Sequence, residues 1–223
     1  MDRVEEMLRY PLFQHIKPEA LGRMLQCVQA RYRKFPKNCY LAMIEDEIRS
    51  IGIVCKGSVQ MVKEDYWGHK TLLAHMREGE MFGETFVCSA SFAAQVSFVT
   101  AEKTEILFLN YDKALHACSM ACTFHHRLVE NMLKCIAGKN IRLMEKIEII
   151  SQKTLRDKLM TYLTMETQKS HFTDFLVALN RTEMAEYLCA DRSAISRELV
   201  SMQEDGLIFF EKNKFRICTE YEK

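Results

Sequence analysis

A change of pattern near Tyr111 divides this chain into two kinds of structure. Between Arg31 and Asn110 the sequence consists of short segments rich in Val, Ile, Phe and Thr, separated by turn formers such as Lys56-Gly57 and Glu78-Gly79. Such segments predict short strands, and their regular spacing favours a small barrel or sandwich. After Tyr111 the apolar residues recur at helical spacing. Strands followed by helices indicate an α+β protein.

Three segments are the clearest strand candidates: Ile51 to Val54, Val59 to Lys63 and Ile106 to Leu109. In the second of these, polar and apolar side chains alternate from Ser58 onward, as expected for a strand with one buried face. Residues 4–28 instead carry apolar side chains at helical spacing, with a proline suited to a first helical turn. We therefore expect short helices ahead of the β domain.

Residues 121–150 predict one long helix with an apolar stripe. The stripe consists of side chains spaced by three, four or seven residues: Leu128, Met132, Cys135, Ile136, Leu143 and Ile147. A stripe of this length needs a partner surface. One interpretation is a two-fold dimer seam made by these six side chains, and the other is packing within a single subunit.

Residues 179–199 predict two short helices joined by a tight turn. Asn180 suits the N-cap of the first helix, with Glu183 three residues later, and Asp191 suits the N-cap of the second. The expected inward-facing side chains are Met184, Ala185 and Leu188, followed by Ile195, Leu199 and Met202. This arrangement leaves Arg192, Ser193, Ser196 and Arg197 on the outer face of the second helix.

The exposed face of the second helix carries chemistry suited to DNA. Short hydroxyl side chains do not obstruct a major groove, and arginine pairs bidentately with guanine. Residues 206–217 then predict a β-hairpin, the wing of a winged helix-turn-helix, with Lys212 and Lys214 available to phosphate. Residues 151–223 hold 11 basic and 12 acidic side chains, so DNA affinity must come from local placement of charge.

Several function classes are disfavoured by the sequence. It has no glycine-rich phosphate loop, nucleophile elbow or HExxH motif, so we do not expect an enzyme. The N-terminus lacks the features of a signal peptide, and no run of about 18 apolar residues occurs, which predicts a cytoplasmic protein without a membrane partner. The nine cysteines are scattered and form no CxxC pair, so most are expected to be buried and reduced.

Four segments resemble the Crp/Fnr family of transcription regulators, and together they cover nearly the whole chain. They are Pro11-Leu12-Phe13 with Ile16, Ile53 to Val59, Gly79 to Glu84, and Asp191 to Leu199. The resemblance implies an effector-sensing double-stranded β-roll with short N-terminal helices (1–120), a long dimerisation helix (121–150) and a winged helix-turn-helix (151–223). It also implies a homodimer that binds a palindromic operator, with RNA polymerase as a further partner if the protein is an activator.

The resemblance also assigns roles to single residues. Arg181 would contact phosphate, Ser193, Ser196 and Arg197 would lie at base edges, and Arg192 would contact either phosphate or base. Cys189 stands at a turn position where many relatives carry glycine. This departure suggests either a turn without a strict need for positive φ or some backbone strain.

The effector is where this sequence departs from the cyclic-nucleotide-binding members. Those members follow their Phe-Gly-Glu motif with Arg-Ser or Arg-Thr, because a buried cyclic phosphate needs a cation. Here no arginine occurs between Arg77 and Arg127. Leu143 and Met144 also stand where those members place hydroxyl groups. Cyclic AMP is therefore not the expected effector, and a small apolar or aromatic ligand is the hypothesis.

The sequence leaves open what the motif Gly79 to Glu84 does. Phe82, Gly83 and Glu84 either line an effector pocket with Leu143 and Met144, or they only preserve a turn and pack the roll.

No cofactor or metal is predicted, although a redox-sensing or haem-sensing regulator of the same family is an alternative. The N-terminal cysteines lie too far apart for the iron-sulfur pattern of the oxygen-sensing relatives. Cys118 and Cys122, with His116, His125 and His126 nearby, can in principle ligate zinc or haem, but ordinary helix residues are the preferred reading. A further alternative is a β-roll that serves as a regulatory or protein-interaction module.

Overall fold

The computed structural model describes residues 3–67, 70–89, 92–115, 123–170 and 172–218. The chain divides into two compact units, residues 1–137 and 138–223, and the division falls inside the long helix α5 (Thr123–Ile150). Each unit has its own hydrophobic core. The division of the chain at residues 120 and 150 that the sequence suggests stays a prediction.

The N-terminal unit begins with helices α1 (Arg3–Met7), η1 (Pro11–Phe13) and α2 (Pro18–Cys27). Its β-roll contains β1 (Arg31–Phe35), β2 (Tyr40–Ala42), β3 (Ser50–Lys56), β4 (Val59–Glu64), β5 (Lys70–Met76), β6 (Met81–Phe82), β7 (Ser97–Thr100) and β8 (Thr104–Asn110). The helices α3 (Glu84–Val87), α4 (Tyr111–Leu115) and the first turns of α5 complete the unit. All three strand candidates from the sequence are confirmed.

The strands form two four-stranded antiparallel sheets, ordered β1-β8-β3-β6 and β2-β7-β4-β5. The polar-apolar alternation expected in β4 is interrupted, because the register with β5 shifts between Met61 and Val62. Val59 and Val62 are both buried as a result, although they are three residues apart. The β3–β4 turn depends on Gly57, whose φ is +81° and where a Cβ atom would lie 2.6 Å from the Lys103 carbonyl oxygen.

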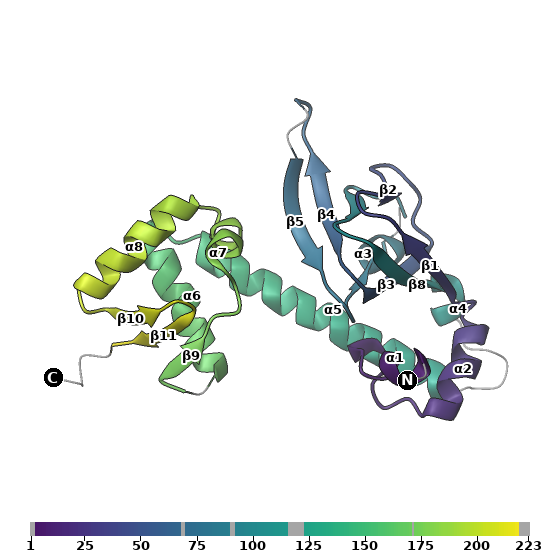
Figure 1. Cartoon of the computed structure of the whole chain (residues 1–223). Coiled ribbons are helices and arrows are strands. Elements are labelled where there is room, and N and C mark those ends of the chain that lie inside the picture. The colour runs from purple at the N-terminus through teal and green to yellow at the C-terminus, as the bar shows by residue number, and fades with distance from the viewer. Residues whose placement is uncertain (1–2, 68–69, 90–91, 116–122, 171, 219–223) are drawn as a thin grey trace. The chain divides into compact units, whose positions relative to one another are not determined.

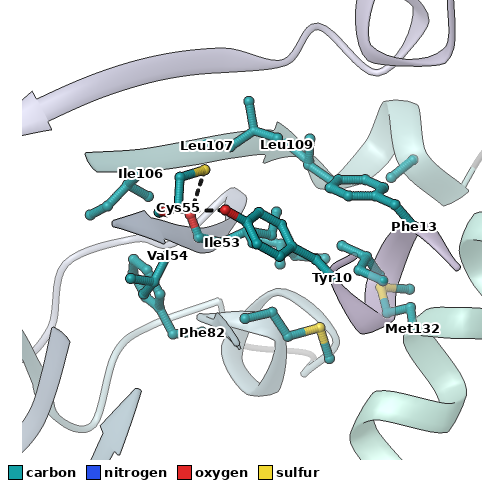
Figure 2. Close-up of a cluster of buried hydrophobic side chains, with 14 of the residues drawn as sticks. Tyr10, Phe13, Ile53, Val54, Cys55, Phe82, Ile106, Leu107, Leu109 and Met132 are labelled. Atoms are coloured by element: carbon teal, nitrogen blue, oxygen red, sulfur yellow. Dashed lines mark hydrogen bonds between the residues drawn. The ribbon is translucent and has the colours of Figure 1, made fainter. Parts of the chain in front are cut away.

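The core of the N-terminal unit joins the helices to the roll (Figure 2). Phe13 from η1 and Met132 from α5 belong to the same buried cluster as Ile53 of β3. Tyr10, itself buried, donates a hydrogen bond from its hydroxyl to the Cys55 carbonyl oxygen at 3.0 Å. Burial raises the pKa of this hydroxyl, which therefore stays a donor.

The structure corrects part of the expected dimer seam. Leu128 and Met132 are only 2% and 4% exposed, because they lie in the core of their own N-terminal unit. Asn131 between them donates hydrogen bonds to the carbonyl oxygens of Leu12 and Gln14, at 3.0 and 2.8 Å. This face of α5 is therefore already covered by the same chain, whereas Leu143 and Ile147 are more than half exposed. Cys135 and Ile136 are partly buried against the same core.

The C-terminal unit comprises the last turns of α5 and α6 (Leu155–Ser170), β9 (Asp174–Leu176), α7 (Arg181–Leu188), α8 (Arg192–Glu204), β10 (Ile208–Glu211) and β11 (Lys214–Ile217). The strands form a sheet in the order β10-β11-β9. The hairpin expected from the sequence is confirmed, while the three-residue β9 was not anticipated. The observed elements confirm the predicted α+β class.

Candidate nucleic-acid interface

The two helices expected at residues 179–199 are α7 and α8, and their local signals explain where they begin and end. The Asn180 side chain accepts hydrogen bonds from the backbone N–H groups of Thr182 and Glu183. The Glu183 carboxylate in turn accepts from the Asn180 N–H at 2.9 Å, which completes a capping box. Asp191 occupies the N-cap position of α8, but its side chain makes no capping hydrogen bond. Asp191 is therefore the N-cap residue that the sequence predicts, but it caps α8 without a side-chain hydrogen bond.

The turn between the helices requires a left-handed residue. Cys189 ends α7 with φ 52° and ψ 54°, and the Ala190 N–H donates to the Ala185 carbonyl oxygen at 3.0 Å. This conformation costs a non-glycine residue free energy, because its Cβ approaches the following carbonyl oxygen. Of the two readings of Cys189, a turn without a positive-φ demand is thus excluded, and the strained turn stands.

The inner faces of both helices pack as the sequence predicts. The side chains of Met184, Leu188, Ile195, Leu199 and Met202 are completely buried, and that of Ala185 is 7% exposed. They form one core with α6 and with Phe215 of β11. Because α7 and α8 share this core, the outer face of α8 is presented from a rigid base.

That outer face carries the side chains proposed for base contacts. Arg192, Ser193, Ser196 and Arg197 are all exposed. The Ser196 hydroxyl donates to the Arg192 carbonyl oxygen at 3.0 Å, and Arg197 Nε donates to the Ser193 carbonyl oxygen at 3.4 Å. Within the described part of the chain neither arginine makes an ion pair, so both guanidinium groups are available to an anionic partner.

The hairpin β10–β11 is tied to both helices. Gln203 of α8 accepts a hydrogen bond from the Phe210 N–H at 2.9 Å. Lys212 sits at the hairpin turn with φ 53° and an exposed side chain. Lys214 is also exposed, but its Nζ lies 3.2 Å from an Asp174 carboxylate oxygen. Of the two wing lysines, Lys214 is thus paired with a carboxylate, and Lys212 is the better candidate for a phosphate contact.

Arg181 lies in a different environment from the one expected for a phosphate contact. Its guanidinium carbon is 5.3 Å from the Phe210 ring centroid and 5.2 Å from that of Phe215, and Nη2 donates to the Lys212 carbonyl oxygen at 2.8 Å. Its Nη1 is buried and has no hydrogen-bond partner. Desolvation lowers the pKa of this group. Arg181 therefore packs against the wing of its own unit.

Sequence reasoning missed Arg156, which lies in the first turn of α6. Its guanidinium contacts two side chains of α8, Glu198 and Ser201, and that of the C-cap residue Asp205. The acceptors are 42 to 49 residues away in the sequence, so no local pattern points to them. Only their spacing along α8, three and four residues apart, hints that they share one face.

In the β-roll, Phe82 is a core residue. It is 5% exposed, and its ring lies 5.1 Å from that of Phe98 and 6.2 Å from that of Phe108, measured between centroids. A Cβ atom at Gly52 would lie 2.3 Å from this ring, so the absence of a side chain there makes room for it. Gly83 has φ 84° and precedes α3. For Phe82 the structure favours packing of the roll over lining a pocket.

The other tentative pocket residues do not alter that picture. Glu84 is 5% exposed, and one of its carboxylate oxygens accepts a hydrogen bond from the Thr85 hydroxyl at 3.4 Å. Leu143 and Met144 belong to the C-terminal unit, within which both are more than half exposed.

The possible metal ligands are only partly covered by the structure. His116, Cys118 and Cys122 lie outside the described residues. His125 is 3% exposed, and His126 is exposed. Over the described ranges, no group of three or more His, Cys, Asp or Glu side chains is arranged to hold a metal ion. A search of the described helices finds none with the length and apolarity needed to span a membrane.

Comparisons with known proteins agree on one family. Residues 32–120 match the model of the cyclic nucleotide-binding domain. The chain is 23% identical over 199 residues to the cyclic AMP receptor protein of Thermus thermophilus, covering 89% of this chain and 88% of the relative.

Two solved regulators share the fold. CLP from Xanthomonas campestris, described as responsive to c-di-GMP, is 16% identical with a TM-score of 0.61, covering 91% of this chain and 100% of that one. FixK2 from Bradyrhizobium japonicum is 13% identical with a TM-score of 0.54, covering 86% and 94%. The domain match and the relative aligned over most of the chain agree with the resemblance to the Crp/Fnr family of transcription regulators seen in the sequence, and the solved structures show the same fold.

Proposed function

We propose that this protein regulates transcription as a homodimer that binds a palindromic DNA operator through α8. The observation that carries the proposal is the outer face of α8, where Arg192, Ser193, Ser196 and Arg197 are exposed together above a buried inner face. Arginine at such a position pairs bidentately with the O6 and N7 atoms of guanine. The exposed Lys212 at the wing turn supplies a phosphate contact.

Dimerisation is supported by apolar side chains of α5 that stay exposed. Leu133, Leu143 and Ile147 are 61%, 56% and 54% exposed, and with Ile136 and Asn140 they recur at alternating intervals of three and four residues. This is the a/d spacing of a two-stranded coiled coil. A two-fold axis along this stripe doubles the number of phosphate contacts, which offsets the nearly neutral charge of residues 151–223.

The effector of the β-roll is proposed to be a ligand without a cyclic phosphate. The support is chemical: no arginine occurs between Arg77 and Arg127, so the surroundings of the Gly79–Glu84 motif include no guanidinium from the segment that follows it. A small apolar or aromatic molecule fits such surroundings better than an anion. Effector binding then shifts the affinity for DNA, and DNA shifts the affinity for effector by the same factor.

The experiment that tests DNA recognition is selection of bound duplexes from a random pool, followed by affinity measurements at several salt concentrations. We expect the wild type to enrich a palindrome and Arg197→Ala to lose preference at one position of each half-site, at a cost of about 1–3 kcal/mol. Arg33→Ala is the matched control, since it removes an exposed arginine from the N-terminal unit. Failure of the wild type to enrich any sequence, with and without candidate effectors, contradicts the proposal.

A separate calorimetric titration tests the effector. Cyclic AMP and c-di-GMP are expected to release no binding heat at concentrations up to 1 mM, taken as about the upper limit of relevant affinity. Saturable binding of either nucleotide that also shifts operator affinity contradicts the effector proposal and leaves the DNA-binding proposal intact.

A further inference from the structure

A single arginine of α6, Arg156, contacts α8 on a face other than the one proposed for base contacts. Arg156 Nε donates to Glu198 Oε1 at 2.6 Å, Nη1 to Asp205 Oδ2 at 2.6 Å, and Nη2 to the Ser201 hydroxyl at 2.9 Å. Every nitrogen of the guanidinium thus contacts a different side chain, two of α8 and one of its C-cap residue. The planar, permanently charged guanidinium is the group best suited to such a fork, because its donors point in fixed directions.

The three acceptors lie on a different face of α8 from the proposed base contacts. Glu198, Ser201 and Asp205 are spaced three and four residues apart and therefore form one stripe. Ser193, Ser196 and Arg197 fall on another stripe, which is exposed. A contact on the first stripe sets the rotation of α8 about its own axis without occupying the surface proposed for DNA.

Arg156 also connects α8 to the end of the long helix within the C-terminal unit. Arg156 lies in the first turn of α6, which follows α5 after the short link 151–154 and lies beside α8 (Figure 1). The last turns of α5 are fixed to α6 and α7 by an ion pair between Glu145 and Lys169 at 2.8 Å and by the Lys146 ammonium over the Tyr187 ring. These contacts therefore link the orientation of α8 to the last turns of α5.

The contact has an electrostatic consequence as well. Glu198 lies on the helix proposed to approach DNA and Asp205 is the C-cap residue of that helix, and both carboxylates would repel phosphate if they were unpaired. Arg156 pairs with both. The hydrogen bond with Glu198, followed by that with Asp205, raises the pKa of the guanidinium, which stays charged at physiological pH.

We propose that Arg156 is a positioning residue for DNA recognition: it fixes the rotation of α8 on α6 and couples that rotation to the last turns of α5. The proposal rests on the proposed function of α8 as the recognition helix. It predicts that loss of Arg156 lowers discrimination between operator and random DNA without removing a phosphate contact.

The test compares Arg156→Met with the wild type and with a control, Lys153→Met. The control removes a positive charge three residues earlier, from a side chain that makes no hydrogen bond or ion pair with α8 in the described structure. Operator affinity of Arg156→Met is expected to fall about ten-fold and random-DNA affinity to stay within about three-fold. The slope of log affinity against log salt is expected to stay unchanged. Equal loss on both DNAs, with the slope reduced by about 0.9, identifies a direct phosphate contact and overturns the proposal. Unchanged discrimination overturns it too.

Glu198→Gln provides a milder variant, because it keeps the side-chain volume and removes one charge. If Arg156 acts through Glu198, adding Glu198→Gln to Arg156→Met causes little further loss of discrimination, whereas full additivity contradicts the proposal. Hydrogen exchange of the α8 amides in the DNA-free protein separates this inference from the proposed function. Faster exchange over 198–205 in Arg156→Met, with an intact far-UV spectrum, supports the positioning role of Arg156 even if no operator is found. Unchanged exchange overturns that role.

Discussion

Cys189 shows that a residue other than glycine can occupy the left-handed turn between the two helices. Its φ of 52° and ψ of 54° are the values that glycine adopts readily, so the turn has kept its geometry at a conformational cost. We expect Cys189→Gly to stabilise the C-terminal unit by up to about 1 kcal/mol, since relief of the left-handed strain of about 1–2 kcal/mol is partly offset by glycine's greater unfolded-state entropy. Urea denaturation of both proteins measures the difference. Destabilisation by glycine would show that the Cys189 side chain contributes more than its strained backbone costs.

Among the elements, the third strand β9 is attached to the wing by charge. Asp174 accepts hydrogen bonds from Arg216 Nε and Nη2, at 2.6 and 3.0 Å, and lies near Lys214. The Arg216 hydrogen bonds, followed by that of Lys214, lower the pKa of Asp174 to about 2. Because the folded-state pKa is depressed, this stabilisation is complete above about pH 4 and is lost as the pH falls toward 2.

We therefore expect the stability difference between wild type and Asp174→Asn to shrink between about pH 5 and pH 2.5. Urea unfolding followed at both pH values measures it. The control is Asp157→Asn, in the first turn of α6, whose carboxylate accepts a hydrogen bond from the Thr154 hydroxyl and not from a wing residue. A difference that stays constant over this interval would mean that the Asp174 charge does not stabilise the sheet.

The apolar stripe of α5 has two parts that differ in exposure. His125, Leu128 and Met132 are buried in the N-terminal unit, whereas Leu143 and Ile147, in the C-terminal unit, are exposed. We expect Leu143→Glu to weaken the dimer at least about ten-fold, because it places a charge in the proposed seam. Sedimentation equilibrium measures the dissociation constant, with Arg142→Glu as a control for added negative charge outside the stripe. An unchanged constant places the dimer contact elsewhere.

For the whole molecule, two separate cores on one chain predict two unfolding transitions. Phe215 of the C-terminal core is 1% exposed and stacks with Phe175 and Phe210, while Phe13 of the N-terminal core is completely buried. We expect Phe215→Ala and Phe13→Ala each to cost about 3–5 kcal/mol and each to lower a different transition in scanning calorimetry. A common shift of all transitions by either variant would show that the two cores unfold together.

How much was predictable from the sequence depends on how local the interaction is. Hydrophobic periodicity identified the strands β3, β4 and β8, the helices α7 and α8, and the wing, and the capping signals at Asn180 and Glu183 marked the start of α7. These signals act between residues close in the chain, where the backbone geometry is known in advance. The resemblance to the Crp/Fnr family then supplied the order of the domains.

Contacts between distant segments could not be foreseen in this way. Which part of the apolar stripe of α5 is buried depends on where η1 and the roll pack. For this reason Leu128 and Met132, which the sequence placed in the dimer seam, lie in the core. Arg181 packs against the aromatic rings of Phe210 and Phe215 in the wing. Arg156 donates to acceptors more than 40 residues away in the sequence. Periodicity tells that a face is apolar or charged, but only the packed chain tells which surface that face meets.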